Sequence, residues 1–320
     1  MAQDRRGKRN CGRLAGLQVS GREPTTPKPG VYSPAMEHFP SQVQLQASAA
    51  EARLLEKERR LLEGLSGLES VIVAFSGGAD SAYLAWAANR ALGGRALAVT
   101  ALSASFSAHD REQAEGFACA QRLRHEFMET AELENPLYAA NHADRCYYCK
   151  DELFTQLDAL AAERGFGAVA YGINADDTHD FRPGHRAAAK HQVLAPLLDA
   201  QLTKSEIREL SRRAGLATWD RPASACLASR VAYGIEVTPE RLGIVERGEA
   251  ILRELGFKQF RVRHHGDLAR IEIDPEELPR ALDAEMARVI ATRFRPLGFA
   301  YITLDLEGYR QGALNASLKK

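Results

Sequence analysis

Residues 70–81 constrain this chain most, because an apolar run ends there abruptly at two glycines followed by an acidic, hydroxyl-rich tail. Residues 71–75 are continuously apolar and mostly β-branched or aromatic, which indicates a central parallel strand covered on both faces. Gly77 and Gly78 let the backbone turn and come close to an anion. Ser81 is a good N-cap for the apolar helical pattern that follows. The stretch therefore predicts a strand, a phosphate-binding turn and a helix whose positive end faces the turn.

The turn differs from two common nucleotide-binding motifs, since it lacks the lysine of the P-loop and the third glycine of the dinucleotide fingerprint. Its residues Ser76-Gly-Gly-Ala-Asp-Ser81 resemble instead the pyrophosphate loop of the N-type ATP pyrophosphatases, which cut ATP between the α and β phosphates. This resemblance implies that Ser76, Gly77, Gly78, Asp80 and Ser81 bind the leaving pyrophosphate while a substrate oxygen attacks the α phosphate. A plain strand-turn-helix with chance glycines is the alternative.

Composition bounds the class of protein. The 320 residues are 45% hydrophobic and 26% charged with a formal net charge of zero, which describes a soluble globular chain long enough for two domains. Zero net charge argues against a nucleic-acid partner. No apolar stretch approaches the roughly 20 residues that a membrane span requires. Five cysteines, an odd number in a chain too large to need disulfides, favour a reducing cytoplasm.

Strands and helices alternate through most of the chain. We expect strands at 71–75, 96–102, 125–130 and 168–172, and helices at 45–65, 81–92, 109–123 and 204–214. The region 136–164 is expected to be helical as well, with the structure of residues 145–150 left open. This alternation predicts an α/β fold with a doubly wound parallel sheet, whose ligands bind beyond the carboxyl ends of the strands. In such a crevice Ser103 would line an adenine pocket. Asp176 and Asp177 would hold Mg²⁺ on the ATP phosphates, with solvated loop acids as the alternative.

The two ends of the chain differ in character from the middle. Residues 1–40 are basic and rich in Pro and Gly, which predicts a disordered extension, and Met36 is an alternative start. Residues 41–232 form the predicted nucleotide-binding domain. Residues 233–320 read as a small α+β domain. Its expected elements are a helix capped by Thr238 and running to Leu255, a hairpin at 259–263 and 268–273, a helix from Pro275 to Arg293 and a strand at 299–306.

Three cysteines are candidates for the chemistry. Cys146 and Cys149 form a C-x-x-C pair, and Cys226 lies in a segment without helical or strand periodicity. A single zinc ion would need a fourth ligand, for which His142 and His179 are available. An iron–sulfur cluster held by three cysteines would keep one iron open. Persulfide or disulfide chemistry without metal is the third possibility. The remaining Cys119 is expected to be a structural thiol beside a buried helix face.

Two arginines near the start of the second domain form another candidate site. Strand alternation sends Arg261 and Arg263 to one face and their apolar neighbours to the other. Two adjacent guanidinium groups bind phosphate well, whereas ordinary solvated arginines are the alternative. His264 and His265 are expected to be structural.

Taken together, several segments resemble the LarE family, ATP-dependent sulfur transferases that build the nickel-pincer nucleotide of lactate racemase. The resemblance covers about residues 45–315 and lies within the PP-loop, adenine nucleotide alpha hydrolase-like superfamily. Its segments are Ser76-Gly-Gly-Ala-Asp-Ser81, Arg145-Cys-Tyr-Tyr-Cys-Lys150, Gly172-Ile-Asn-Ala-Asp-Asp177, Arg182-Pro183, Arg221-Pro-Ala-Ser-Ala-Cys-Leu-Ala-Ser-Arg230, Arg261-Val-Arg-His-His265 and Glu307-Gly-Tyr-Arg310.

This resemblance implies a reaction on pyridinium-3,5-biscarboxylic acid mononucleotide. ATP adenylates a carboxylate, sulfur displaces AMP, and a thiocarboxylate results. Some family members sacrifice the cysteine that matches Cys226. Others carry cysteines matching Cys146, Cys149 and Cys226 and are associated with a [4Fe-4S] cluster that delivers sulfide. Because all three are present here, the resemblance favours the cluster-dependent variant, with Cys226 catalytic and turnover possible once the sulfide is replaced.

The resemblance also implies that Arg261 and Arg263 hold the ribose phosphate of the substrate. It further implies a homo-oligomer assembled through the small second domain. Two other readings stay open at this point. One is a tRNA-thiolating enzyme that shares the loop, and the other is an amide- or nitrile-forming ligase whose cysteines bind structural zinc.

Overall fold

The computed structural model describes residues 42–179, 184–222 and 225–310. The basic extension expected at 1–40, including Met36, lies outside these residues, as does the Arg182-Pro183 pair. Among the helices of the described chain, none combines the length and the apolar composition that crossing a bilayer requires.

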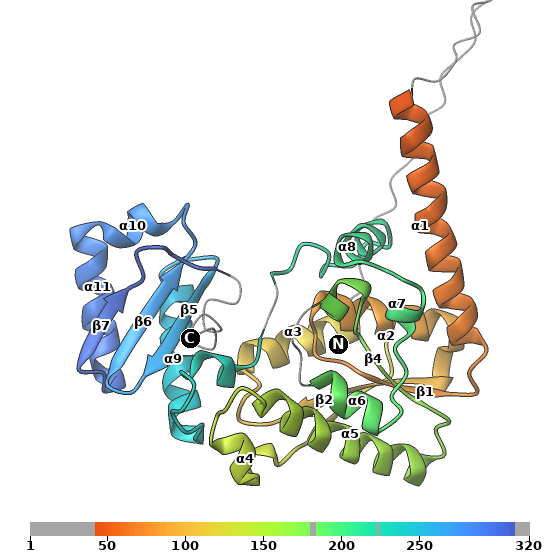
Figure 1. Ribbon diagram of the computed structural model, residues 1–320. Coiled ribbons are helices and arrows are strands. Elements are labelled where there is room, and N and C mark those ends of the chain that lie inside the picture. Colours follow the sequence, from red (N-terminus) through yellow and green to blue (C-terminus); the bar gives the residue numbers. More distant parts are fainter. Residues whose placement is uncertain (1–41, 180–183, 223–224, 311–320) are drawn as a thin grey trace, which may run out of the picture. The chain divides into compact units, whose positions relative to one another are not determined.

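A parallel sheet forms the centre of the larger part of the chain (Figure 1). Its strands lie in the order β3-β2-β1-β4, and every neighbouring pair is parallel. Their bounds are β1 Val71–Ala74, β2 Ala96–Leu102, β3 His125–Glu129 and β4 Val169–Tyr171. The chain passes from β1 through β2 to β3 in one direction and then crosses to β4 on the other side of β1. The order reverses between β1 and β4, where α/β sheets bind their ligands.

Helices cover both faces of this sheet, as the predicted doubly wound α/β fold requires. One face packs against α1 (Gln42–Ser66), α2 (Ala79–Leu92), α3 (Ala108–Ala120) and α8 (Lys204–Arg213). The other packs against α5 (Arg145–Arg164) and α6 (Gly184–Lys190). Two short helices, α4 (Pro136–Ala139) and α7 (Pro196–Asp199), complete this part. The predicted fold class is confirmed.

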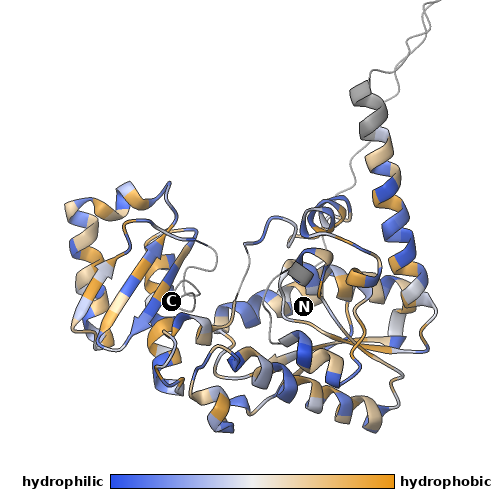
Figure 2. Ribbon diagram, viewed as in Figure 1, coloured by the Kyte–Doolittle hydropathy of each residue, from blue (hydrophilic) through white to orange (hydrophobic). Residues whose placement is uncertain are grey.

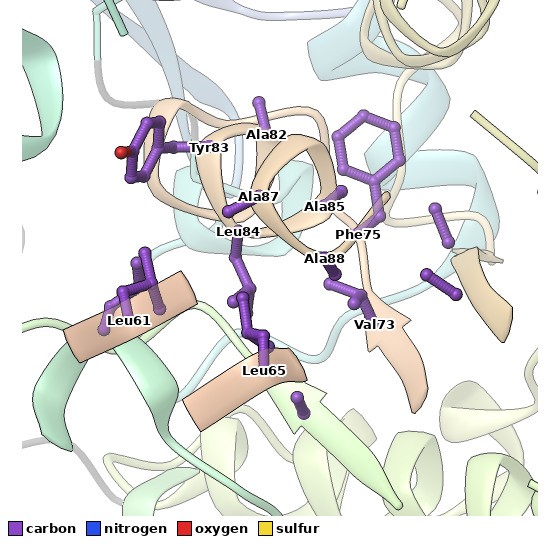
Figure 3. Close-up of a cluster of buried hydrophobic side chains, with 14 of the residues drawn as sticks. Leu61, Leu65, Val73, Phe75, Ala82, Tyr83, Leu84, Ala85, Ala87 and Ala88 are labelled. Atoms are coloured by element: carbon purple, nitrogen blue, oxygen red, sulfur yellow. The ribbon is translucent and has the colours of Figure 1, made fainter. Parts of the chain in front are cut away.

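The alternation of side chains along β1 divides the core into two clusters. Val71, Val73 and Phe75 belong to the cluster with α2, whereas Ile72 belongs to the cluster with α5. Figure 3 shows Leu61 and Leu65 of α1 beside α2. Each fully buried side chain of this size stabilises the fold by about 1.5–3 kcal/mol. Figure 2 shows hydrophobic residues concentrated on the central strands.

The first turn of α2 differs from the prediction. The helix begins at Ala79 with Gly78 as its N-cap, so Ser81 is not the N-cap. The Ser81 hydroxyl instead donates to the Gly78 carbonyl at 3.1 Å and accepts from the Ser76 amide at 3.2 Å. The helix therefore starts earlier because Ser81 closes the loop from inside the first turn. At the other end Gly93 is the C-cap.

Local contacts define the start of another helix and correct one further expectation. Thr203 and Glu206 form the capping box that opens α8, a pair whose spacing marks it in the sequence. The C-x-x-C pair lies in the first turn of α5. Cys119 is exposed on α3, so the expectation that it packs as a structural thiol is wrong. The helix turns so that Phe117 and Ala118 are buried and Cys119 is not.

A second, three-stranded sheet follows in the chain. β5 (Phe260–His265) and β6 (Leu268–Ile273) form the expected antiparallel hairpin, and β7 (Tyr301–Leu304) runs parallel to β6. The helices α9 (Pro239–Glu254) and α11 (Ala284–Phe294) share its core. The single helix expected from Pro275 to Arg293 is interrupted: α10 (Leu278–Leu282) ends, and Asp283 caps α11 by accepting from the Glu285 and Met286 amides.

Candidate active site

The glycine loop after β1 has the geometry that a phosphate-binding turn needs. Gly77 has φ +75°, which L side chains rarely adopt, and an added Cβ would meet Ala114 Cβ at 3.4 Å. The hydroxyls of Ser76 and Ser81 lie 3.0 Å apart. Because Gly78 precedes the first turn of α2, the unpaired amides of that turn face the loop. The loop can therefore bind an anion at the carboxyl edge of the sheet.

Arg221 reaches this loop from a distant part of the chain. Its Nη1 donates to the Gly77 carbonyl at 2.5 Å and its Nη2 to Gln113 Oε1 at 2.5 Å. Arg208 of α8 holds the same segment by donating to the Arg221 carbonyl at 2.6 Å. Sequence reasoning gave Arg221 no role, although it begins the segment that ends with Arg230. The feature of the sequence that could have pointed to Arg221 is its position in the same segment as Cys226.

Two carboxyl groups meet beside the loop at the end of β4. Asn174 Nδ2 donates to Asp80 Oδ2 at 3.0 Å, and Lys204 Nζ forms an ion pair with the buried Asp177 at 2.8 Å. Burial, and then the charge of Asp177, raise the pKa of Asp80. The exposed Asp176 turns to the start of α8, where it accepts the Lys204 amide at 2.8 Å. The structure thus brings Asp177 together with Asp80 and places Asp176 apart from them.

A buried hydroxyl and carboxyl network continues along the edge beyond β2 and β3. The Ser103 and Ser105 hydroxyls lie 2.8 Å apart. Ser105 donates to Glu132 at 3.0 Å, and Thr130 donates to the other oxygen of Glu132 at 2.8 Å. Glu132 is only 3% exposed, so these donors compensate for the burial of its charge. Ser103 directly follows β2, so it lies at the carboxyl edge of the sheet.

The three candidate thiols lie together at the same edge of the sheet. Cys146 and Cys149 start α5, and Cys226 caps the short helix Leu227–Arg230. The Leu227 amide donates to the Ser105 carbonyl at 2.8 Å, which places Cys226 beyond β2. Cys149 and Cys226 pack against one hydrophobic cluster of α4 and α9 residues. All four cysteines of the described residues are free.

The surroundings of Cys146 and Cys149 oppose a negative charge on their sulfur atoms. Desolvation raises the pKa of Cys149 to about 12 against the opposing charge of Lys150, and the nearby Cys226 and Cys146 add to the rise. Desolvation and then Cys226 also raise the pKa of Cys146, while Arg145 acts to lower it. The three thiols are therefore close enough to repel one another once ionised. A positive charge close to the sulfur atoms would favour the thiolate form of Cys146 and Cys149.

Two residues that sequence reasoning missed adjoin the thiols. Arg145 is 3% exposed and donates to Asn141 Oδ1 and to the Ala228 carbonyl. Burial acts to lower its pKa, but the charges of Cys226 and Cys146 outweigh this and raise it. Tyr138 is 1% exposed, and its hydroxyl has no hydrogen-bond partner in the described part of the chain, although Ser105 is near.

The charges of Cys226 and Cys149 add to burial in raising the pKa of Tyr138. The signal for Arg145 was its position directly before the C-x-x-C pair. No sequence signal marked Tyr138, because its neighbours belong to other segments of the chain.

The two candidate phosphate ligands have different surroundings. Arg263 is 6% exposed, pairs with Glu272 at 2.8 Å and donates to the Ser229 carbonyl at 2.9 Å. Arg261 is less buried and lies over the Tyr309 ring at 5.1 Å. Burial, and then repulsion from Arg230, lower the pKa of Arg261. Both side chains lie on the expected face of β5, next to the segment that carries Cys226.

The zinc alternative required a histidine beside the thiols. His142 is exposed just before α5, and the side chain of His179 lies outside the described residues. Within the described ranges, no group of three or more His, Cys, Asp or Glu side chains is arranged to hold a single metal ion.

Comparison with known proteins places the chain in a family. No protein-family model matches it. The pyridinium-3,5-bisthiocarboxylic acid mononucleotide synthase of Lactiplantibacillus plantarum is 34% identical over 272 residues, which cover 84% of this chain and 97% of that protein. An uncharacterized protein of Synechocystis is 42% identical over 268 residues, 83% of this chain and 100% of that protein. An uncharacterized protein of Methanocaldococcus jannaschii is 30% identical over 170 residues, 53% of this chain and 66% of that protein.

The match to the synthase extends over nearly the whole length of that protein, and the loop, sheet and cysteine segments described above all lie in one continuous fold. The chain belongs to the LarE family, the family of the pyridinium-3,5-bisthiocarboxylic acid mononucleotide synthases.

Proposed function

We propose that this protein is an ATP-dependent sulfurtransferase. It adenylates the carboxylates of pyridinium-3,5-biscarboxylic acid mononucleotide with release of pyrophosphate and replaces AMP by sulfur. Family membership supports this reaction. The observation that carries it is the position of the Cys226 segment, which contacts both the glycine loop, through Arg221 and Gly77, and the end of β2, through Leu227 and Ser105. Activation and sulfur delivery therefore have a common location.

Adenylation is needed because a carboxylate is a poor electrophile whose leaving group would be oxide. In the proposed reaction Ser76, Gly77, Gly78, Asp80 and Ser81 hold the pyrophosphate, and amides at the start of α2 stabilise its growing charge. Ser103 lines the adenine pocket. The pairing of two carboxyl groups, with the raised pKa of Asp80, supports a Mg²⁺ site.

In this proposal Asp80 and Asp177 are the first Mg²⁺ ligands. Asp176 accepts the Lys204 amide and fixes the start of α8 beside these two carboxyl groups.

The donor set around Cys226 fits an iron–sulfur cluster. Three thiols lie at one edge with a buried guanidinium, that of Arg145, beside them. Cluster ligands lie farther apart than the ligands of a single ion, because each binds a different iron. We propose Cys146, Cys149 and Cys226 as the three ligands, and such a cluster, when bound, supplies sulfide at its open iron. Arg145 would stabilise the negative charge of the sulfur ligands, and Cys226 is the proposed catalytic cysteine.

The second sheet carries the residues that we propose for substrate binding. Arg261 and Arg263 would hold the ribose phosphate, so that binding energy from a remote group positions the reacting carboxylate. Glu272 and the Ser229 carbonyl keep the Arg263 side chain rigid. We propose residues 41–232 as the ATP-binding domain and 233–320 as the domain for substrate binding and homo-oligomer assembly.

The reaction is tested with anaerobically purified protein, ATP, Mg²⁺, the dicarboxylate nucleotide and added sulfide. Pyrophosphate release and thiocarboxylate formation are measured separately, the second by mass spectrometry. Cys226→Ala is expected to keep pyrophosphate release and lose thiocarboxylate. Cys119→Ala, a change at an exposed thiol away from the edge, is the matched control and should behave as wild type. Normal multiple turnover by Cys226→Ala would defeat the assignment of this cysteine.

The same preparation tests the cluster. The cluster is supported if the purified protein contains iron and acid-labile sulfide, and if their content falls in Cys146→Ala and Cys149→Ala but not in Cys119→Ala. Stoichiometric zinc would contradict the cluster. We place the activity in the reducing cytoplasm, where the free thiols of the described chain stay reduced.

A further inference from the structure

The glycine loop lacks a cation of its own. Residues 76–81 contain no Lys or Arg, whereas the P-loop carries a lysine that reaches the phosphates. Asp80 even adds a carboxyl group. A diphosphate leaving from this loop bears several negative charges, and amides with one metal ion compensate only part of them. A cation from elsewhere in the fold is required to compensate the remaining negative charge of the diphosphate.

Arg221 is placed to be that cation. Its Nη1 lies 2.5 Å from the Gly77 carbonyl and 3.7 Å from where a Gly77 Cβ would be. Both side-chain hydrogen bonds that it makes within the described residues end on neutral oxygens, those of Gly77 and Gln113. A guanidinium group has five N–H donors, so several remain for a ligand.

The backbone of Arg221 is held in place. Arg208 donates to the Trp219 carbonyl at 3.0 Å and to the Arg221 carbonyl at 2.6 Å, and the Arg221 amide donates to the Thr218 carbonyl at 3.2 Å. These bonds join the segment to α8. The backbone that carries the guanidinium group is therefore held in place beside the loop. This reduces the conformational entropy that Arg221 loses when it binds a ligand.

Within the described ranges, the hydrogen bonds of the Arg221 guanidinium end on neutral acceptors, and Asp110 and Asp220 act on it through their charge. The side chain is half-buried, and burial lowers its pKa while Asp110 and Asp220 act in the opposite direction. An arginine nonetheless stays protonated in a protein. A partly desolvated cation against neutral acceptors gains more from a phosphate oxygen than from a carbonyl oxygen, because charge-assisted hydrogen bonds are about twice as strong.

We infer that Arg221 binds the diphosphate leaving group directly, exchanging the Gly77 carbonyl for phosphate oxygens. This inference rests on the proposed cleavage of ATP between its α and β phosphates. It makes Arg221 a ligand of pyrophosphate supplied by the segment that also carries Cys226.

The test is calorimetric titration of the full-length protein with inorganic pyrophosphate in the presence of Mg²⁺, and separately with AMP. Arg221→Gln is expected to weaken pyrophosphate binding about 10- to 100-fold and to leave AMP binding within twofold. Arg221→Lys keeps the positive charge but lacks the paired N–H donors of the guanidinium group. Its affinity for pyrophosphate should fall about 10-fold or less. Arg95→Gln is the matched control, since Arg95 also donates to carbonyl oxygens, those of Leu68 and Glu69, at the other edge of the sheet.

A purely structural role for Arg221 makes a different prediction. If the role were only structural, Arg221→Gln would weaken AMP binding and pyrophosphate binding alike, and the salt dependence of both would stay unchanged. If Arg221 contacts pyrophosphate, binding of pyrophosphate should be less salt-dependent in Arg221→Gln than in wild type. Pyrophosphate affinity in Arg221→Gln within twofold of wild type overturns the inference alone. A wild-type protein that neither binds pyrophosphate nor releases it from ATP overturns the proposed function and this inference with it.

Discussion

Glu272 of β6 is completely buried and pairs with Arg263 of β5 at 2.8 Å. Its other oxygen accepts from Arg270 at 2.8 Å. One carboxylate thus organises two guanidinium groups on the face of the sheet that we propose for the substrate phosphate. The position of Arg263 depends on Glu272, which sequence reasoning did not single out.

Replacing Glu272 by Ala should be costly for the fold. Arg263 would keep its charge in a buried position and, of the two partners that the described residues give it, only the Ser229 carbonyl would remain. The free energy of unfolding should therefore fall by about 3–5 kcal/mol. Urea denaturation measures this. Glu63→Ala breaks an exposed ion pair with Arg59 and should change stability by about 1 kcal/mol or less. Equal effects in the two variants would contradict the buried pairing.

Two buried tyrosines differ in one hydrogen bond. The Tyr83 hydroxyl donates to Glu58 at 3.1 Å, whereas the Tyr138 hydroxyl finds no partner in the described chain. Tyr83→Phe should therefore lower the free energy of unfolding by about 1 kcal/mol. Tyr138→Phe should leave it unchanged or raise it by about 1 kcal/mol, because an unpaired buried group is removed. A clear loss in Tyr138→Phe would show that Ser105 or another group bonds this hydroxyl.

The turn at Gly77 can be tested by adding a single methyl group. Gly77→Ala forces an L side chain to φ +75°, which costs about 1–2 kcal/mol and shifts the loop. Pyrophosphate release should fall at least tenfold. Gly94→Ala is the control, because nothing lies within 4 Å of a Cβ there and no positive φ is required. Full pyrophosphate release by Gly77→Ala would show that the loop tolerates a Cβ and that its geometry is not the critical feature.

The raised pKa of Asp80 predicts a pH dependence. The folded state holds this proton more tightly than the unfolded chain, whose carboxyl has the ordinary value of 3.8. Stability without ligand should therefore decrease as pH rises above that value and through the folded-state pKa. Asp80→Asn removes this loss, so its melting temperature without ligand should exceed that of wild type at pH 7 but not at the acid end. Mg²⁺-dependent ATP binding should weaken in the same variant.

The exposed Asp199 supplies the control for this experiment. Asp199→Asn should leave both the melting temperature and ATP binding unchanged at either pH. A melting curve of Asp80→Asn that follows wild type across the whole pH range would contradict the raised pKa.

Much of the fold follows from local patterns. The apolar run at 71–75, the spacing of Thr203 and Glu206 and the alternation along β5 each act within a few residues, so each could be read from the sequence. The predictions were wrong where a contact with a distant residue, or a competing local contact, determined the structure. Ser81 could have capped α2, but its bonds to Ser76 and Gly78 close the loop instead.

What the sequence determined by itself was the class of fold, the order of its elements and the residues at the ends of its strands, because hydrophobic periodicity and glycine conformations are local properties. Only the tertiary structure decided which of these residues meet. Arg221 reaches Gly77 across 144 positions of sequence, Asp177 rather than Asp176 joins Asp80, and Tyr138 and Arg145 adjoin Cys226. Such contacts depend on how distant segments pack, and no local pattern encodes that packing.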